Sequence, residues 1–334
     1  RPLSPPFRKV IPDGIPSEPG KEPHRHEEDL PLNLVDYLLS STLRPGGSLR
    51  GVGDDPMIID PEWSGADLMA AALADLGVTT VFCITGAGNL ALVDALQRRG
   101  DIALVYCHHE QAVVMAAQGF ARQSGKVGVA LVTTGGGAAN AFTGALSANM
   151  DSIPLVLISG NESSYHCLDM ADFRAFGVQG FDSTAAFRPI TKSASRILSV
   201  GEIVPTLEKR WREASGGRKG VSFIDFPMDI QRRSVDLPVG EVPTSAHAVA
   251  QELPGIDIAA VERCADSLMC AERPLIYLGN GVRDGDALDF VRRIVETLRV
   301  PFLLSWSALD LIHDDHALNM GRVGIYGDRA ANIL

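Results

Sequence analysis

Four short apolar segments, separated from one another by segments with helical spacing, constrain the fold of this chain more than any other feature. Nearly every residue in these segments is apolar, so both faces of each must be buried, as in the strands of a parallel sheet. The four expected strands span residues 79–84, 102–107, 127–132 and 154–159. Strands of this kind that alternate with helices predict an α/β fold, a doubly wound parallel sheet covered by helices on both faces.

The helices between these strands have recognisable starts and ends. Ser64, with Asp67 three residues later, resembles a capping box, and the apolar stripe that follows stops at Gly77. Further helices are expected through Leu92, Leu96 and Arg99, over 110–123, over 140–149 and, after an irregular stretch, over 201–214, with a fifth strand at 221–226.

The composition divides the chain into further parts. Residues 1–61 hold 11 of the chain's 20 prolines and little apolar sequence, so we expect an extended arm. A short helix over 32–43 is the alternative for part of it, and an arm that drapes over the surface is favoured. The doubly wound domain then covers 62–230, and the proline-containing stretch 231–255 is expected to be a linker.

A second α/β pattern covers residues 256–334. The expected elements are a helix to 269, a strand at 275–278, a helix at 286–298, a strand at 300–305 and a helix at 326–334. A doubly wound domain needs more strands than these two. We therefore expect an incomplete Rossmann-like α/β domain.

Charge and cysteine content exclude several classes of protein. The formal net charge is −11 and no run of Lys or Arg is present, which argues against nucleic acid and anionic membranes as partners. No apolar run approaches the ~20 residues that span a bilayer. The five cysteines are scattered, without a Cys-x-x-Cys pair, and no secretory signal is recognisable. These features predict a cytoplasmic protein.

The expected strand ends carry the candidate binding loops. Open parallel sheets bind ligands at the carboxyl ends of their strands, and here these ends hold TGAGN (85–89), HHEQ (108–111), TTGGGAAN (133–140) and SGNES (159–163). Glycine lets a backbone approach a ligand closely, and a helix N-terminus favours an anion or a polar ring edge. Each glycine loop alone is equally consistent with an ordinary tight turn. Four such loops around one acid predict a ligand site.

That acid is Glu110, at the start of an expected helix directly after a strand. One interpretation is a carboxylate that complements the helix dipole, worth ~0.3–1 kcal/mol. The other is a carboxyl group in an apolar cleft, where it exchanges a proton with the nitrogen of a bound ring. Sequence spacing alone leaves both interpretations open.

A resemblance favours the second interpretation. The run over 65–159 resembles the pyrimidine-binding domain of acetolactate synthase-like thiamine-diphosphate (ThDP) enzymes. That family has an R/H-H-E-x-x-A-x-x-A-x-G-[YF]-A-R block, a T-[ST]-G-P-G-x-x-N loop and a D-S-x-P strand entry. Here they read HHEQAVVMAAQGFAR, TTGGGAAN and DSIP. The similarity continues to FIDFPMDIQ and, more weakly, through the second domain, so that it covers roughly 62–334.

The resemblance implies a mechanism and a set of site residues. The family's glutamate, matched by Glu110, hydrogen-bonds a nitrogen of the aminopyrimidine, so that the cofactor's amine in its imine form deprotonates the thiazolium carbon to the ylid. The implied cofactor-binding residues are Thr85, Gly86, His109, Glu110, Thr134, Gly135, Gly136 and Asn140, with Gln111 and Asn161 on the substrate side. We expect no metal at the pair His108 and His109, because no cysteine or acid cluster completes a shell.

The family also has a third domain, which holds Mg²⁺ and the diphosphate through a Gly-Asp-Gly motif followed by Asn. No such pattern occurs in residues 1–334. We therefore expect Mg²⁺ on a partner chain, in a hetero-oligomer such as a dimer of heterodimers, or else that the chain is a fragment. The loop GNGVRDG (279–285) is compatible with FAD but equally with an ordinary turn, which is favoured.

Departures from the family pattern leave the substrate open. The common G-x-P-G turn is replaced by residues 83–86, the proline of T-S-G-P-G by Gly136, and the glutamine of T-G-Q by Asn161. The favoured function is the pyrimidine-binding component of a ThDP-dependent carboligase or 2-oxoacid decarboxylase. A non-catalytic scaffold or regulatory relative is the alternative, and a nucleotide-binding α/β protein a weaker one. The presence of Glu110 favours the enzyme.

Overall fold

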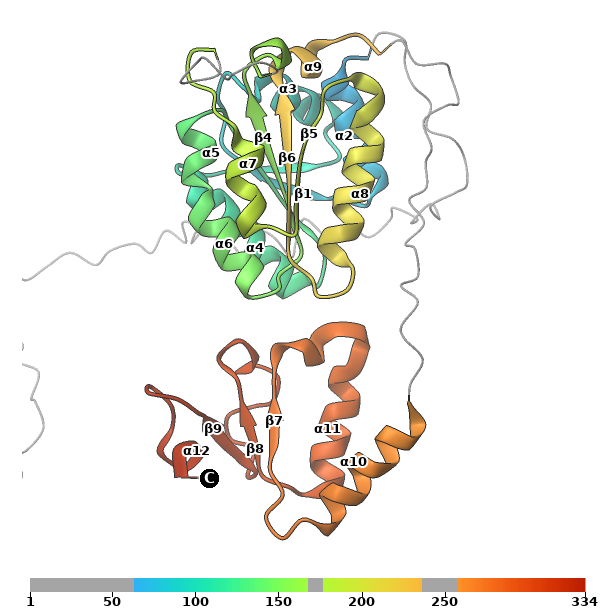
Figure 1. Cartoon of the computed structure of the whole chain (residues 1–334), viewed down its shortest axis with the longest axis vertical. Coiled ribbons are helices and arrows are strands. Elements are labelled where there is room, and N and C mark those ends of the chain that lie inside the picture. Colours follow the sequence, from blue (N-terminus) through green and yellow to red (C-terminus); the bar gives the residue numbers. More distant parts are fainter. Residues whose placement is uncertain (1–62, 168–176, 236–256, 334) are drawn as a thin grey trace, which may run out of the picture. The chain divides into compact units, whose positions relative to one another are not determined.

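The computed structural model describes residues 63–167, 177–235 and 257–333. The expected arm and its alternative helix over 32–43 lie outside these residues, as does most of the expected linker. The described residues form two α/β domains, 63–235 and 257–333, which are considered separately (Figure 1).

The first domain is built on a six-stranded sheet in which every pair of neighbours is parallel. The strand order is β2-β1-β3-β4-β6-β5. The strands are β1 (Thr80–Cys83), β2 (Ala103–Tyr106), β3 (Gly128–Val132), β4 (Leu155–Asn161), β5 (Ser193–Arg196) and β6 (Val221–Pro227). Strands β1, β3, β4 and β6 are buried at every position, as apolar residues on both faces require.

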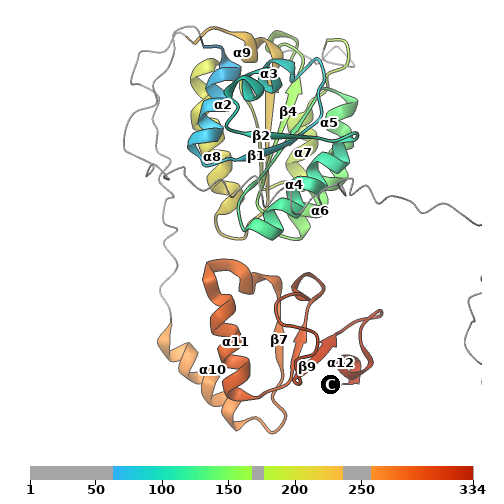
Figure 2. The ribbon, with the colours of Figure 1, turned by 180° about the vertical axis from the view of Figure 1, so that it is seen from behind.

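Helices cover both faces of this sheet (Figures 1 and 2). One face packs against α2 (Gly65–Asp75), α3 (Leu90–Arg99), α8 (Ile203–Ser215) and α9 (Met228–Arg232). The other packs against α4 (Glu110–Ser124), α6 (Phe142–Met150) and α7 (Ser183–Phe187), and α5 (Gly136–Asn140) contacts α4 and α6. Short 3-10 turns occupy Ser164–His166, Arg188–Ile190 and Val200–Glu202. Two buried apolar clusters, one on each face, therefore enclose the sheet, and the predicted doubly wound architecture is confirmed.

The start of α2 shows why this segment is helical. Ser64 Oγ accepts a hydrogen bond from Asp67 N at 3.3 Å, and Asp67 Oδ2 accepts one from Ser64 N at 2.9 Å. This reciprocal pair satisfies two of the amides that a helix N-terminus leaves without partners. The capping box expected from the sequence is confirmed.

Several elements differ from the sequence prediction. The helix expected over 140–149 is two helices, α5 and α6, because Ala141 separates them and α5 already begins at Gly136. Strand β5 lies in the stretch expected to be irregular. Its residues, Ser-Ala-Ser-Arg, are only half-buried at the edge of the sheet, so they do not show the apolar pattern of a buried strand. Strand β2 is the other edge strand and is also partly exposed, although its sequence is apolar.

The first domain extends beyond residue 230, where the linker was expected to begin. Gln231 is buried, and its Nε2 donates to the carbonyl oxygens of Gly88 at 2.6 Å and Phe226 at 2.7 Å. Ser234 forms a β-bridge with Ser64, and Val235 is buried in the same cluster as α2. Residues 231–235 therefore pack on this domain.

The second domain contains a three-stranded parallel sheet in the order β7-β8-β9. Its elements are α10 (Ile258–Cys270), β7 (Ile276–Leu278), the 3-10 segment Asn280–Asp286, α11 (Ala287–Leu298), β8 (Phe302–Leu304), the 3-10 turn Trp306–Ala308, β9 (Asn319–Arg322) and α12 (Arg329–Ile333). Strand β9 was not expected, and α12 begins three residues after the predicted start at 326. No helix in the described parts of the chain is long and apolar enough to cross a membrane.

Candidate functional site

Parallel pairing brings the loops that follow β1, β2, β3 and β4 to one edge of the first domain's sheet. Carboxyl ends of parallel strands point the same way, so each loop begins at this edge. Three of these loops lead into helices α3, α4 and α5, whose N-termini face the edge. The predicted site residues from 85 to 161 are thus on one side of the domain.

Glu110 is the first residue of α4 and is half-buried, and its carboxylate meets the loop after β3. Asn140, at the end of α5, donates from Nδ2 to Glu110 Oε2 at 3.0 Å. A Cβ added to Gly137 would lie 3.0 Å from Glu110 Oε1 and 2.6 Å from Thr133 Cγ2. The loop can therefore approach the carboxylate only because residue 137 lacks a side chain. Glu110 and Asn140, both predicted, are brought together, and Gly137 is a contact that the prediction did not include.

His109 supplies the N-cap of α4. Its backbone is extended, with φ −152° and ψ 138°, and its Nδ1 accepts a hydrogen bond from Gln111 N at 3.1 Å. The ring is exposed. This bond satisfies one of the free amides of the helix start, so the side chain next to Glu110 has a defined orientation.

The loop after β1 packs directly on the loop after β3. A Cβ on Gly86 would overlap the side chain of Thr133, and a Cβ on Gly88 would overlap Thr134 Oγ1. Asn89 is fully buried and holds the turn, since its Oδ1 accepts from Gly86 N and its Nδ2 donates to the carbonyl oxygen of Ile84, both at 2.9 Å. Glycine at 86 and 88 is thus required by close packing between loops.

The two threonines at this contact retain unused hydrogen-bonding capacity. Thr134 is 3% exposed, and the Oγ1 atoms of both Thr133 and Thr134 are buried without a hydrogen-bond partner among the described residues. Unsatisfied buried hydroxyls are uncommon in folded proteins. Next to them, Gly135 has a φ of 65°, a left-handed conformation that favours glycine.

The remaining predicted residues occupy different positions. Thr85 and Gly136 are exposed, and Gly135 is buried beneath the carbonyl oxygen of Gln179, which leaves no space for a side chain there. Gln111 is half-buried on α4, where its Nε2 lies 3.9 Å from the sulfur of Met115.

Asn161, predicted on the substrate side, turns its amide into the protein. It is 2% exposed, its Nδ2 donates to Asp225 Oδ2 at 2.9 Å, and its Oδ1 accepts from Glu162 N at 2.9 Å. Both ends of the amide are therefore engaged in the chain itself. In this structure Asn161 joins β4 to β6.

Asp225 and Arg196 form a buried charge pair that the sequence analysis did not single out. Arg196 Nε donates to Asp225 Oδ2 at 2.6 Å, and Arg196 also contacts Asp182 Oδ1 at 3.2 Å. Burial raises the pKa of Asp225, whereas Arg196 and the hydrogen bond from Asn161 oppose that rise. The signal in the sequence is an acid inside the otherwise apolar run FIDF, since an Asp is rarely fully buried unless it is paired.

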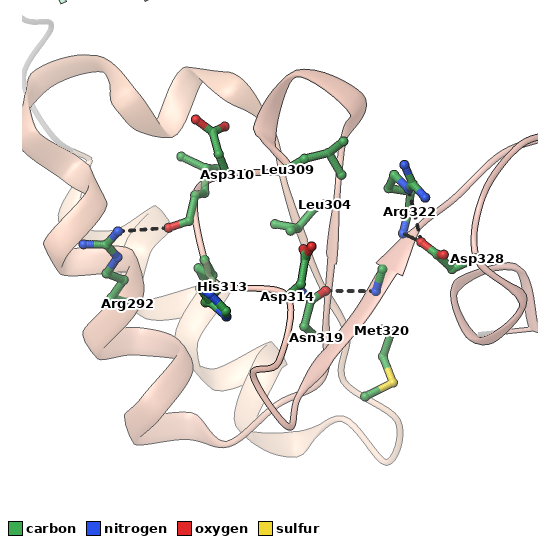
Figure 3. Close-up of a pocket in the computed structure, with 13 residues that line it drawn as sticks. Arg292, Leu304, Leu309, Asp310, His313, Asp314, Asn319, Met320, Arg322 and Asp328 are labelled. Atoms are coloured by element: carbon green, nitrogen blue, oxygen red, sulfur yellow. Dashed lines mark hydrogen bonds and ion pairs between the residues drawn. The ribbon is translucent and has the colours of Figure 1, made fainter. Parts of the chain in front are cut away.

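A hollow of about 890 Å³ lies on the second domain (Figure 3). It is lined by residues of α11, of the segment that follows β8, of β9 and of the segment before α12, including Arg292, Asp310, Arg322 and Asp328. Arg322 Nε contacts Asp328 Oδ2 at 3.2 Å, Arg292 donates to the carbonyl oxygen of Leu311 at 3.2 Å, and Asp310 pairs with Arg283. These charged side chains have partners within the domain, so we assign no catalytic role to this hollow.

The first domain's strand-end edge presents a carboxylate and a side-chain amide beside a glycine loop. No group of three His, Cys, Asp or Glu that could hold a metal is found among the described residues. Glu110 offers a carboxylate held by Asn140, beside a glycine loop with no side chain in the way. A carboxyl group in such a place can exchange a proton with a nitrogen heterocycle. Fold and site together define an α/β domain of the class that binds ligands at the carboxyl ends of its parallel strands.

Comparison with known proteins gives the family. Residues 63–186 match the family model "Thiamine pyrophosphate enzyme, N-terminal TPP binding domain", and residues 261–334 match "Thiamine pyrophosphate enzyme, central domain". The chain belongs to the thiamine-diphosphate-dependent, acetolactate synthase-like family. The resemblance identified from the sequence is confirmed.

Curated relatives of the chain are acetolactate synthases. The chain is 34% identical over 271 residues to the acetolactate synthase isozyme 3 large subunit of Escherichia coli K12, covering 81% of this chain and 46% of the relative. It is 31% identical to the acetolactate synthase of Bacillus subtilis, covering 81% and 45%, and 32% identical to the probable acetolactate synthase large subunit of Methanocaldococcus jannaschii, covering 80% and 44%. The chain thus spans less than half the length of these relatives.

Proposed function

We propose that residues 63–235 form the aminopyrimidine side of the active site of a ThDP-dependent carboligase or 2-oxoacid decarboxylase, with Glu110 as the catalytic acid. The observation that carries this proposal is the position of the Glu110 carboxylate, at the strand-end edge and 3.0 Å from Asn140 Nδ2. A carboxylate that only complemented the dipole of α4 would need neither this partner nor the close approach of Gly137.

The surroundings of Glu110 support a different role for each of its two carboxylate oxygens. Oε2 accepts the amide hydrogen of Asn140, whereas Oε1 makes no hydrogen bond with the described residues. We infer that Oε1 holds the exchangeable proton and that Asn140 keeps the carboxyl group from rotating. When bound, ThDP supplies an electron sink for making or breaking a bond next to a carbonyl carbon. Glu110, Asn140 and the loop over 133–137 would hold its aminopyrimidine ring.

We further propose that Mg²⁺ and the diphosphate are held by a segment outside residues 1–334, on a partner chain within a hetero-oligomer. The family matches within this chain are to the N-terminal and central domains. The partner would carry the diphosphate-binding domain of the same enzyme. Donor and acceptor substrates are proposed only as a class, 2-oxo acids and carbonyl compounds.

The test is substitution of Glu110 in the natural assembly, purified through a tag on this chain. Glu110→Gln should lower ThDP-dependent release of CO₂ from pyruvate or 2-oxobutyrate by ~10²-fold or more, the usual contribution of a general acid–base group. The exposed Glu296→Gln is the matched control and should leave the rate unchanged. Thiochrome fluorescence of the denatured assembly measures bound ThDP independently of turnover. Assemblies without ThDP would favour the non-catalytic scaffold instead.

A further inference from the structure

The cap of α4 determines which nitrogen of His109 carries a proton. Gln111 N–H donates to His109 Nδ1 at 3.1 Å. Only an unprotonated ring nitrogen accepts such a bond, so a neutral His109 in this geometry must be protonated at Nε2. His108, the preceding residue, has no hydrogen bond of this kind among those that the structure describes, and its tautomer is therefore not determined in the same way.

The protonated nitrogen of His109 points away from the helix. The two nitrogens of an imidazole ring diverge, so Nε2 is directed away from the amides of α4 when Nδ1 faces them. The ring is exposed, and Nε2 makes no hydrogen bond with the described residues. One residue later, Glu110 Oε1 is also without a hydrogen bond there. A fixed N–H donor and a free carboxylate oxygen thus follow one another along the chain at the strand-end edge.

We propose that His109 orients the substrate by donating from Nε2–H to an oxygen of a 2-oxo acid. This inference rests on the proposed function, and it assigns to His109 a role distinct from that of Glu110. A carboxylate or carbonyl oxygen is the chemical partner that such a donor requires, and the N-terminus of α4 adds a favourable potential for a negative charge. Glu110 exchanges the proton of the ring, whereas His109 holds the reacting molecule.

Two substitutions separate this role from capping. Asparagine places an oxygen close to the position of Nδ1 and is among the best N-caps, so His109→Asn keeps the cap but loses the distant donor. Glutamine places an amide nitrogen close to the position of Nε2 but caps poorly, so His109→Gln keeps the donor and loses the cap. The two variants should therefore show opposite defects.

In the natural assembly, each substitution should change only one of two quantities, the KM for the substrate or the melting temperature. His109→Asn should raise KM for pyruvate or 2-oxobutyrate about tenfold, the effect of one hydrogen bond to a charged group, with the melting temperature unchanged. His109→Gln should lower the melting temperature by several degrees and leave KM near that of the unsubstituted enzyme. A normal KM in His109→Asn would overturn the inference and leave His109 as a cap only.

A second measurement needs neither turnover nor a partner. Long-range ¹H–¹⁵N correlation spectra of the 334-residue chain at pH 8 report the tautomer of each histidine, and the signal missing in His109→Asn assigns His109. We expect a protonated Nε2 and an unprotonated Nδ1. A protonated Nδ1 would overturn the inference. If instead Glu110→Gln keeps full activity or the assembly holds no ThDP, the proposed function fails, whichever tautomer is found.

Discussion

The two domains share a pattern of alternating strands and helices but differ in how completely the residues of these elements are buried. In residues 63–235, two apolar clusters enclose a six-stranded sheet, and α2 buries eight of its 11 residues. In residues 257–333, one cluster lies against a three-stranded sheet, and α10 has no buried residue. Ile258 and Val261 on α10 are 61% and 54% exposed. A local sequence pattern is therefore enough to form an element, whereas its burial depends on how many other elements surround it.

The largest expected difference between the domains is in the free energy of unfolding lost when a phenylalanine is replaced by alanine. Phe223 in β6 is fully buried and stacks on Phe187 with ring centroids 4.2 Å apart, so Phe223→Ala should lower the free energy of unfolding by about 3–5 kcal/mol. Phe290 on α11 is 58% exposed, and Phe290→Ala should change it by about 0.5 kcal/mol or less. Urea unfolding followed by circular dichroism measures both. Equal losses would show that Phe290 is covered in the intact protein.

A smaller difference in the loss of stability is expected when one ion pair in each domain is broken. Arg196→Met leaves the fully buried Asp225 without its cation and should cost about 3 kcal/mol at neutral pH, near the lower end for broken buried pairs. Arg322→Met breaks an ion pair with the solvent-accessible Asp328, which water and salt screen, and should lower the free energy of unfolding far less than Arg196→Met.

The pH dependence of the Arg196→Met loss follows from Asp225. Burial raises the pKa of this carboxyl group, and removal of Arg196 raises it further. A carboxyl group with a raised pKa favours the folded state below its unfolded value, ~3.9, and this contribution is lost as pH rises through the folded pKa. The loss in Arg196→Met should therefore shrink as pH falls from 7 towards 4, as measured by urea unfolding at several pH values. A loss that is independent of pH would contradict this account.

The smallest expected difference concerns two helix caps. Ser64→Ala removes the capping box of the buried helix α2 and should lower the free energy of unfolding by about 1 kcal/mol. Asp257→Ala removes the cap of the exposed helix α10, where Asp257 accepts from Ala260 N at 3.0 Å. Because α10 is not buried, this second change should only fray the helix and reduce ellipticity at 222 nm. A shift of the main unfolding transition in Asp257→Ala would argue against this difference.

The capping box also has a pH signature. Although burial opposes ionisation of Asp67, the hydrogen bonds from Ser64 and Arg98 lower its pKa. Stability from a lowered carboxyl pKa is present above ~3.9 and is lost as pH falls through the folded pKa. Ser64→Ala should therefore weaken the dependence of stability on pH below about 4, in the same unfolding measurements. An unchanged acid limb would show that Arg98 alone holds the ionised carboxylate.

The positions of candidate residues in the fold were easiest to predict where they follow a buried strand. Glu110 could be located because an apolar run ends just before it, and its family pattern is contained in one block. The role of Gly137 was missed, because its missing side chain matters only when Thr133 and Glu110 lie against it. Asn161 was expected to face the substrate, but the direction of its amide depends on Asp225, 64 residues away.

By itself the sequence determined the central strands, the capped helix α2 and the place of Glu110. Burial on both faces favours apolar residues at most strand positions, and a cap needs only residues three apart, so these signals are local and can be read directly. Three features could be found only in the tertiary structure. They are the edge strand β5, the hydrogen bond between Asn140 and Glu110, and the Arg196–Asp225 ion pair. Each of these depends on which distant segments are brought together, because half-exposed strands tolerate polar residues and a hydrogen bond requires its partner in place.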